Sequence, residues 1–359
     1  MADNKDKKVL NVPALRFPEF TEEWREYAIG NVLSIGNGRD YKHLHNGDIP
    51  VFGTGGYMTS VDDFLYDGES VFIGRKGTIN KPLYYNGKFW TVDTLFYTHS
   101  FVNVLPKFAY CLFQTINWLK YNEASGVPSL SKATIEKIKV RIPSMDEQDK
   151  LSNQLFLLDK RIEVQNKIIE KLETLIKGIR HNVFQQLRKD VGFNSTIGDI
   201  LSFEQPQRYI VSSTEYSDDS SCTPVLTANK AFILGYTTET DGIYSKGDCI
   251  IIDDFTLDCK YVSFPFKIKS SAIKILTAEN KYILRFIYEY LKSLDISTEE
   301  HKRHYITEIQ PSSCILPDDK TLTTIALMFE SITNKLENEQ SLALMLNKQK
   351  QYLLSKMFI

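Results

Sequence analysis

Several short segments of this 359-residue chain join basic side chains to glycine, serine or aromatic residues. Arg, Lys, Ser and Thr side chains donate hydrogen bonds to phosphate oxygens and base edges, and glycine lets the backbone approach a phosphate closely. Three such clusters in the first half supply the candidates for contact with DNA: Arg39, Tyr41, Lys42, His43, Arg75, Lys76, Thr78, Ser129, Ser131 and Lys132. A solvated turn is the alternative for each cluster.

The second half of the chain is more acidic, with aspartate pairs at 218–219 and 253–254. A carboxylate can accept a hydrogen bond from the N4 amino group of cytosine, so this acidity lowers non-specific affinity without excluding base readout. The candidates for DNA contact in this half are Gln205, Gln207, Arg208, Lys230, Lys260, Lys302 and Arg303.

The net charge of the chain is close to zero. It has 43 Lys and Arg against 45 Asp and Glu, which gives −2 at pH 7. A free-standing DNA-binding protein is usually basic, because its cations displace counterions from the phosphates. We therefore expect weak DNA binding by the chain alone, and a partner that supplies positive charge.

Two segments resemble parts of catalytic motifs. The glycine loop Phe52–Gly56 follows an apolar run, but a lone glycine loop is weak evidence for a cofactor site, and the rest of an adenine methyltransferase motif is absent. Asp258–Lys260 matches the end of a nuclease D-x-K motif without an evident acidic strand as partner. The chain also has no P-loop, so we expect a turn at the glycine loop, an accidental match at Asp258–Lys260, no catalytic residue and no bound metal.

The five cysteines are scattered and odd in number, which predicts neither a disulfide framework nor a metal-binding pair. Their use fits a reducing cytoplasm. The first residues are polar, without the apolar core of a signal peptide, and no run of about 18 apolar residues predicts a membrane span. A cytoplasmic protein without membrane contact is expected.

The candidate clusters lie between short apolar and aromatic runs punctuated by Gly, Asn and Asp, a pattern typical of strands and turns. Strands are expected at 70–74, 88–92 and 267–275. Each half also contains a helical stretch, at 108–121 and 281–294. This mixture predicts α+β domains.

The two halves of the chain repeat one order of elements. Ile29–Ser34 matches Ile197–Ser202 at an offset of 168, and Ile142–Pro143 matches Leu316–Pro317 at an offset of 174. Each proline precedes a long charged segment that has helical periodicity. The expected parts are a tail (1–20), a first recognition domain (21–143), a helix (144–190), a second recognition domain (191–317) and a second helix (318–359).

Both long helices carry a heptad pattern, with apolar residues at alternating steps of four and three. The predicted seam comprises Leu151, Leu155, Leu158, Ile162, Gln165, Ile169, Leu172, Ile176 and Ile179 in the first helix. The same register in the second helix gives Ile325, Phe329, Ile332, Leu336, Glu339, Leu346 and Leu353. The first helix, from about 146 to 187, would be roughly 60 Å long.

Neither helix can bury its apolar stripe alone. Matched lengths favour an antiparallel coiled coil of the two helices within one chain, in which the polar Gln165 and Glu339 fix the register. The alternatives are two helices that each dock on their own domain, or a homodimeric coiled coil. Two similar domains on a paired rod predict a pseudo-two-fold molecule that suits a target with two half-sites at fixed separation.

These motifs, in this order and doubled, resemble the specificity (S) subunits of type I restriction–modification systems. The resemblance begins with Leu15–Phe20 and Trp24, and continues with Ile142–Pro143 and Glu147–Gln148. The leucine-rich helix then ends near Phe184, and the second copy ends with Leu353–Phe358. The resemblance covers nearly the whole chain, but the second copy has Pro317–Lys320 and lacks the Glu–Gln pair.

The resemblance implies a non-catalytic subunit with two mixed α/β target recognition domains and an antiparallel coiled-coil spacer. Each domain would read one half of a bipartite site in double-stranded DNA. The paired helices would set the gap and dock two methyltransferase (M) and two restriction (R) subunits. S-adenosylmethionine, ATP and Mg would be bound by these partners. The alternative function is a non-catalytic adaptor between proteins, without DNA readout.

Overall fold

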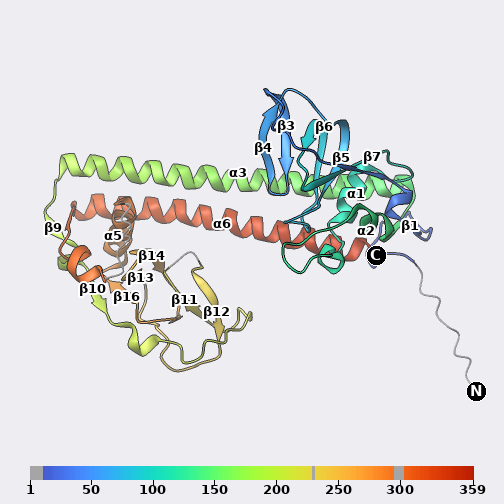
Figure 1. Ribbon diagram of the computed structural model, residues 1–359. Helices are drawn as coiled ribbons and strands as arrows, with labels where there is room; N and C mark the ends of the chain where they lie inside the picture. Colours follow the sequence, from blue (N-terminus) through green and yellow to red (C-terminus); the bar gives the residue numbers. More distant parts are fainter. Residues whose placement is uncertain (1–10, 229–230, 295–302) are drawn as a thin grey trace, which may run out of the picture. The chain divides into compact units, whose positions relative to one another are not determined.

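The computed structural model describes residues 11–228, 231–294 and 303–359. Unit 1 comprises residues 1–166 together with 342–359, and unit 2 comprises residues 167–341. Each unit combines strands with helices, so the expected mixed α/β class is confirmed. Two long helices, α3 (Met145–Asp190) and α6 (Asp319–Met357), each contribute to both units (Figure 1).

Unit 1 is built around a six-stranded sheet with the order β2-β7-β5-β6-β3-β4. Its strands are β2 (Ser34–Asn37), β3 (Asn46–Gly53), β4 (Gly56–Val61), β5 (Tyr66–Gly74), β6 (Leu83–Thr91) and β7 (Leu95–His99). A separate pair joins β1 (Arg25–Ala28) to β8 (Lys139–Ile142). The helices are η1 (Ile29–Asn31), α1 (Pro106–Phe113), η2 (Trp118–Tyr121) and α2 (Lys132–Lys137).

The central strand β5 explains how this sheet is covered on both faces. Successive side chains of a strand point to opposite faces. Val71 and Ile73 belong to the main core, which also contains α1, whereas Phe72 between them packs into an aromatic cluster with Phe52 and Phe89. Val71, Phe72 and Ile73 are all fully buried. An unbroken apolar run of this kind is typical of a strand that is covered on both faces.

The helix predicted at 108–121 is shorter than expected. It begins at Pro106, whose missing N–H costs nothing at a helix start, and ends at Phe113. The Trp118 indole then donates to the Phe113 carbonyl at 2.8 Å, and the chain continues as the separate turn η2. Trp118 is buried in the core.

Unit 2 contains three small sheets, with the orders β10-β16-β13-β14, β12-β11-β15 and β17-β9. Its strands are β9 (Ser195–Thr196), β10 (Ser202–Glu204), β11 (Thr223–Leu226), β12 (Ile233–Thr237), β13 (Cys249–Asp253), β14 (Cys259–Val262), β15 (Lys267–Ile268), β16 (Ile273–Thr277) and β17 (Ser313–Cys314). Its short helices are α4 (Ile197–Ile200), η3 (Pro206–Tyr209), α5 (Lys281–Ser293) and η4 (Tyr305–Ile309).

The single strand predicted at 267–275 is wrong, because β15 and β16 belong to different sheets. β15 pairs with β11, whereas β16 lies between β10 and β13. The polar residues Lys269, Ser270 and Ser271 lie between the two strands.

The long helices pack against each other and against the domain core inside each unit. In unit 1, Leu151 and Leu155 of α3 share a core with Leu354 and Met357 of α6. The cores of unit 2 bring the other ends together, with Phe184 of α3 stacked on Phe329 of α6 at 6.5 Å between ring centroids. Every residue of the predicted seam is buried or half-buried.

An ionic cluster formed by Arg180, Arg285 and Glu289 ties α5 to α3 in unit 2. The Glu289 carboxylate is 1% exposed and accepts two hydrogen bonds from Arg180, at 2.7 and 3.0 Å. Arg285 lies 3.1 Å from the other oxygen of Glu289 and also donates to the Phe329 carbonyl of α6 at 3.3 Å. One carboxylate therefore contacts two nearly buried guanidinium groups and balances one of their two charges.

The Glu147–Gln148 pair at the start of α3 is used inside unit 1. Glu147 is buried and accepts two hydrogen bonds from Arg16, at 2.7 and 2.8 Å. Gln148 is fully buried, accepts from the Leu105 N–H at the start of α1 and donates to the carbonyl of Asn103. Residues 11–20, predicted as a tail, are thus held by the helix start.

The second long helix begins differently. The carboxylate of Asp318 accepts a hydrogen bond from the backbone N–H of Thr321 at 3.0 Å, and from the hydroxyl of the same residue at 2.7 Å. Both hydrogen bonds lower the pKa of Asp318, and the bond from the backbone N–H has the larger effect. The missing Glu–Gln pair of the second copy is therefore replaced by a local cap of the helix.

Candidate nucleic-acid interface

Two of the three predicted clusters of unit 1 meet in one groove of about 600 Å³, which we call the basic groove. It opens where β5 ends and β7 begins. The groove is lined by Asn37, Arg75, Lys76, Asp93, Thr94, Phe96, Glu123, Ser129, Leu130, Ser131 and Lys132. The structure thus brings the Arg75–Lys76 loop and the Ser129–Lys132 segment together.

Backbone hydrogen bonds hold the two walls of the basic groove. Lys76 and Ser129 form an antiparallel bridge, and the Leu130 N–H donates to the Arg75 carbonyl at 2.9 Å. On the other side, the Arg75 N–H donates to the Thr94 carbonyl at 2.8 Å. The loop depends on Gly77, whose φ of +94° is strained for any residue with a Cβ atom.

The side chains of Arg75 and Lys76 are exposed at the rim. The Arg75 guanidinium lies 5.9 Å from the centroid of the Phe96 ring and donates to the Asp93 carbonyl at 3.3 Å. Within the described part of the chain, neither Arg75 nor Lys76 has a carboxylate within 4.0 Å. Two cations therefore remain available for an external anion.

Ser129 and Ser131 lie outside the helices, whereas the next candidate, Lys132, belongs to a helix. Lys132 is the first residue of α2, and the Ser131 hydroxyl caps this helix by accepting from the Thr134 N–H at 3.2 Å. Ser131 also donates to the Glu123 carboxylate at 2.8 Å. The hydroxyls of Thr134 and Ser131 lower the pKa of Glu123, which places one ionised acceptor among the cations.

The remaining candidates of unit 1 lie outside the lining of the basic groove. Arg39 is exposed, and its carbonyl accepts from the Trp90 indole at 2.8 Å. The ring of His43 contacts Trp90 edge-on at 5.8 Å, and Lys42 is exposed. The half-buried residues Tyr41 and Thr78 also lie outside this lining.

The candidates of unit 2 are scattered over several elements. Gln205 accepts from the buried Lys274 ammonium at 2.9 Å, so its carbonyl oxygen already has a partner. Gln207 and Arg208 are exposed on η3, and Lys260 is half-buried on β14. The candidates Lys230 and Lys302 lie outside the described residues.

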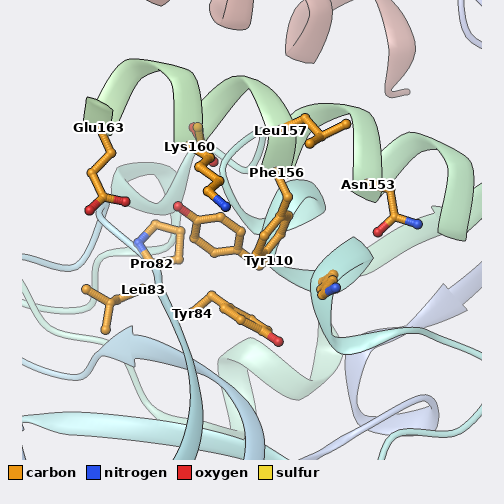
Figure 2. Close-up of a pocket in the computed structure, with 11 residues that line it drawn as sticks. Pro82, Leu83, Tyr84, Tyr110, Asn153, Phe156, Leu157, Lys160 and Glu163 are labelled. Carbon is orange, nitrogen blue, oxygen red and sulfur yellow. The ribbon is translucent and has the colours of Figure 1, made fainter. Parts of the chain in front are cut away.

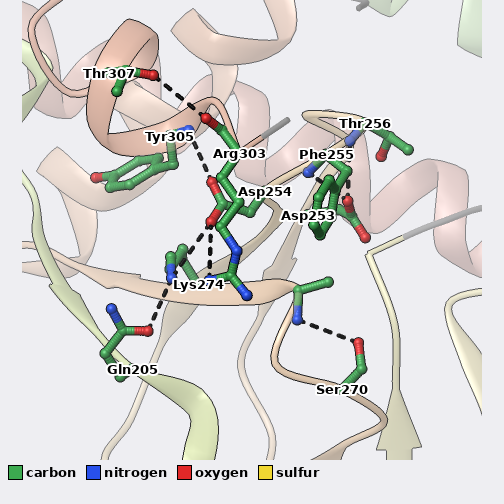
Figure 3. A network of polar contacts seen from close by, with 11 residues as sticks. Gln205, Asp253, Asp254, Phe255, Thr256, Ser270, Lys274, Arg303, Tyr305 and Thr307 are labelled. Atoms are coloured by element: carbon green, nitrogen blue, oxygen red, sulfur yellow. Dashed lines mark hydrogen bonds and ion pairs between the residues drawn. The ribbon is translucent and has the colours of Figure 1, made fainter. Parts of the chain in front are cut away.

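Among the candidates of unit 2, Arg303 contacts a network of buried polar side chains (Figure 3). Its side chain is 52% exposed, and its Nη1 lies 3.8 Å from Oδ2 of Asp254, which is 1% exposed. The Asp254 carboxylate also accepts from the Tyr305 N–H at 2.9 Å and lies 3.5 Å from the Lys274 ammonium. Asp254 and its neighbour Asp253, noted in the sequence as an acidic pair, are thus both buried.

A second hollow in unit 1, of about 690 Å³, was not predicted from the sequence. We call it the apolar hollow; it lies between β6, α1 and the first turns of α3 (Figure 2). It is lined by Pro82, Leu83, Tyr84, Lys107, Tyr110, Asn153, Phe156, Leu157, Asp159, Lys160 and Glu163. Its aromatic side chains come from segments far apart in the sequence, so no local pattern could announce it.

Of the two segments that resemble catalytic motifs, the first forms a hairpin turn and the second forms the start of strand β14. Gly53 ends β3 and Gly56 begins β4, so the glycine loop is the turn of a hairpin. Asp258 is an exposed residue before β14, and the neighbouring Cys259 is buried in the core. Among the described residues, no group of three His, Cys, Asp or Glu side chains could hold a metal ion. No described helix is both long and apolar enough to cross a membrane.

Comparison with known proteins places these features in context. Residues 21–174 match the model of the type I restriction modification DNA specificity domain. The chain is 41% identical over 143 residues to the type I restriction enzyme EcoR124I/EcoR124II specificity subunit of Escherichia coli. That match covers 38% of this chain and about a third, 35%, of the relative.

Similarity to a solved structure extends over nearly the whole chain. The crystal structure of a type I restriction–modification S subunit from M. genitalium aligns with a TM-score of 0.75 at 16% identity, covering 97% of this chain and 99% of that chain. At this identity the likeness concerns the fold. Together with the sequence matches it confirms the resemblance to S subunits.

Proposed function

We propose that the chain is an S subunit that reads a bipartite DNA site, because residues 21–174 match the type I restriction modification DNA specificity domain. The observation that carries this proposal is the basic groove, where Arg75 and Lys76 stand exposed beside Ser129 and Lys132. Such groups bind phosphates and donate to base edges. The groove would hold the first half-site.

The proposal of a second reading domain is supported by matched features in the two units. Ile29 and Ile197, equivalent in the sequence repeat, are both fully buried at the start of a short helical turn. The glycine that follows each is pressed against a neighbour: a Cβ atom on Gly30 would lie 3.0 Å from Glu136, and one on Gly198 would lie 2.7 Å from Gln310. We infer that unit 2 reads the second half-site.

The long helices are proposed to form an antiparallel coiled-coil spacer that sets the gap and docks two M and two R subunits. The burial of every predicted seam residue supports the coiled coil. Docking is supported by apolar side chains that α3 leaves uncovered: Leu157 beside the apolar hollow is 65% exposed, and Val164 is 49% exposed. Such side chains are typical of surfaces that partners cover.

The chain itself would do no chemistry in this assembly. S subunits are the non-catalytic components of type I systems, and S-adenosylmethionine, ATP and Mg are expected on the M and R subunits. The net charge of −2 fits this division, because the partners would supply much of the attraction to DNA phosphates. The alternative is an adaptor that binds only proteins.

Methylation mapping tests DNA reading directly. The chain is co-expressed with its cognate M subunit, and modified adenines are located genome-wide. Arg75→Ala and Lys76→Ala are each expected to lower methylation by about tenfold, because each weakens recognition of one half of the motif. Lys120→Ala is the matched control, since Lys120 is an exposed lysine of unit 1 outside the basic groove. Arg208→Ala probes the half read by unit 2.

Two further variants separate the alternatives. Exchange of residues 21–143 for the corresponding domain of another S subunit should change one half of the motif only. An unchanged motif after this exchange would favour the adaptor. Insertion of one heptad into both α3 and α6 should lengthen the gap between the half-sites, and an unchanged gap would contradict the spacer.

A further inference from the structure

We propose that Asp254 is a positioning residue that holds Arg303 for contact with DNA, so that Arg303 serves in unit 2 as Arg75 serves in unit 1. The inference rests on the proposed function. It concerns the buried network in Figure 3, whose acidic member is the opposite of what a DNA-binding surface is expected to contain.

The backbone around Asp254 repeats the frame that forms the basic groove. Arg75 follows the last residue of β5, and Asp254 follows the last residue of β13. The Arg75 N–H donates to a carbonyl just before β7, and the Asp254 N–H donates to the Ala272 carbonyl just before β16. Both bonds are short, at 2.8 and 2.7 Å.

The opposite wall repeats the frame as well. In unit 1 the Leu130 N–H donates to the Arg75 carbonyl at 2.9 Å, and in unit 2 the His304 N–H donates to the Asp254 carbonyl at 2.8 Å. A short helix follows in both cases, α2 after Leu130 and η4 after His304. Position 254 is therefore the counterpart of position 75.

The side chains at these matched positions have opposite charge and opposite exposure. Arg75 points its guanidinium to the rim, whereas Asp254 is 1% exposed. The counterpart of Ser129, one residue before the donor of the opposite wall, is Arg303. The arginine is therefore on one wall in unit 1 and on the opposite wall in unit 2. In unit 2 the position equivalent to Arg75 is Asp254, whose carboxylate lies 3.8 Å from Arg303.

The charge balance leaves Arg303 available. Lys274, also 1% exposed, lies 3.5 Å from Asp254 and forms the buried ion pair, which is neutral. The neighbouring carboxylate of Asp253 accepts from two backbone N–H groups, at 2.9 and 3.0 Å, and Glu308 pairs with His304 at 2.9 Å. Asp254 is therefore shared by two cations, and the trio of Asp254, Lys274 and Arg303 carries one net positive charge.

The geometry suits a guanidinium that must stay oriented while it binds something else. Arg303 lies over the ring of Phe255, 5.8 Å from its centroid, and its Nη1 lies 3.8 Å from the Asp254 carboxylate. A guanidinium has five N–H donors in a fixed fork, so most remain for an acceptor oxygen of DNA. Holding a long side chain in advance lowers the entropy lost on binding.

The test uses the complete complex with its M subunit and a duplex that carries the mapped methylated motif. Arg303→Ala is expected to weaken binding of that duplex by about tenfold. If the contact is to a phosphate, the loss is uniform over base changes and the salt dependence of log Kd falls by about one unit. If it is to a base, discrimination falls at one position of the half-site read by unit 2. Either result supports the proposal.

Asp254→Asn alone should reproduce most of the loss of DNA affinity that Arg303→Ala causes. Added to Arg303→Ala, it should cause no further loss of affinity. Asp254→Asn with Lys274→Met removes the buried pair together and serves as the second variant, because it leaves no unpaired buried ammonium. Thermal unfolding of each variant shows whether unit 2 is intact. Lys281→Ala, which removes an exposed cation at the start of α5, is the matched control and should change nothing.

Two results would overturn the inference. The first is a wild-type affinity after Arg303→Ala. The second is an equal loss from the aspartate variants with and without Arg303, in proteins that remain folded. If Arg75→Ala still weakens one half-site in either case, the proposed function stands and only this inference fails.

Discussion

Replacement of Glu289 by glutamine isolates the ionic cluster of unit 2. Glutamine keeps the shape of the side chain and one acceptor, but it removes the carboxylate charge that contacts both Arg180 and Arg285. The side chains of these two arginines are 14% and 10% exposed. Two nearly buried guanidinium groups would then face each other without a counterion.

The expected loss follows from the burial of all three groups. Removal of one partner from a buried ion pair costs about 3–5 kcal/mol, because the remaining charge stays desolvated. We take about 3 kcal/mol, since both arginines keep some access to water. For a unit of this size that loss lowers the unfolding temperature by roughly 6–12 °C. Arg180→Met should cost less, because Glu289 keeps Arg285.

The distribution of tryptophan gives an assay for each unit. Trp24, Trp90 and Trp118 are the three tryptophans of the chain, and all lie in unit 1. Glu289→Gln should therefore shift the far-UV circular dichroism transition and leave the fluorescence transition in place. The control is Glu279→Gln, at an exposed position just before α5, which should stay within about 0.5 kcal/mol of wild type. An unshifted dichroism transition for Glu289→Gln would refute the argument.

Three further results are expected. Gln148→Ala should lower the stability of unit 1 by about 2 kcal/mol in a fluorescence-detected urea titration, because it leaves buried backbone groups without partners; a loss below about 0.5 kcal/mol would count against this. Leu158→Asp should cost about 3 kcal/mol or more, since Leu158 is 6% exposed, whereas the same change at the 65% exposed Leu157 should be tolerated; equal stability of the two variants would contradict the seam. Burial, and secondarily the charge of Lys132, lower the pKa of His99, so its contribution to stability is complete above about pH 6.5 and is lost as the pH falls. Lys132→Met should raise the pKa of His99 in an NMR titration, and an unchanged value would show that the lysine does not act there.

The sequence predicted local patterns well and long-range pairing poorly. The first long helix was expected from about 146 to 187 and runs from Met145 to Asp190, because heptad periodicity survives without tertiary information. The meeting of Arg75 with Ser129 depends on a backbone bridge between distant segments. No pattern within either segment could indicate that pairing.

The sequence does not show which side chains serve as hydrogen-bond or ion-pair partners of other buried groups. Glu147 belongs to the motif that resembles S subunits, and its carboxylate accepts two hydrogen bonds from Arg16 at the start of α3. The sequence shows Asp254 only as half of an acidic pair, because its burial depends on Lys274 and on the Tyr305 N–H. A charge in a sequence does not indicate where its counterion will be found.

The composition of unit 1 also bears on how the protein is made. Its core is completed by Leu354, Met357 and Phe358, whereas unit 2 is formed by one uninterrupted stretch of chain. During translation, the second domain can therefore close before the first, although the ribosome makes it later. A nonsense mutation that removes only the last turn of α6 would damage the domain encoded at the other end of the gene.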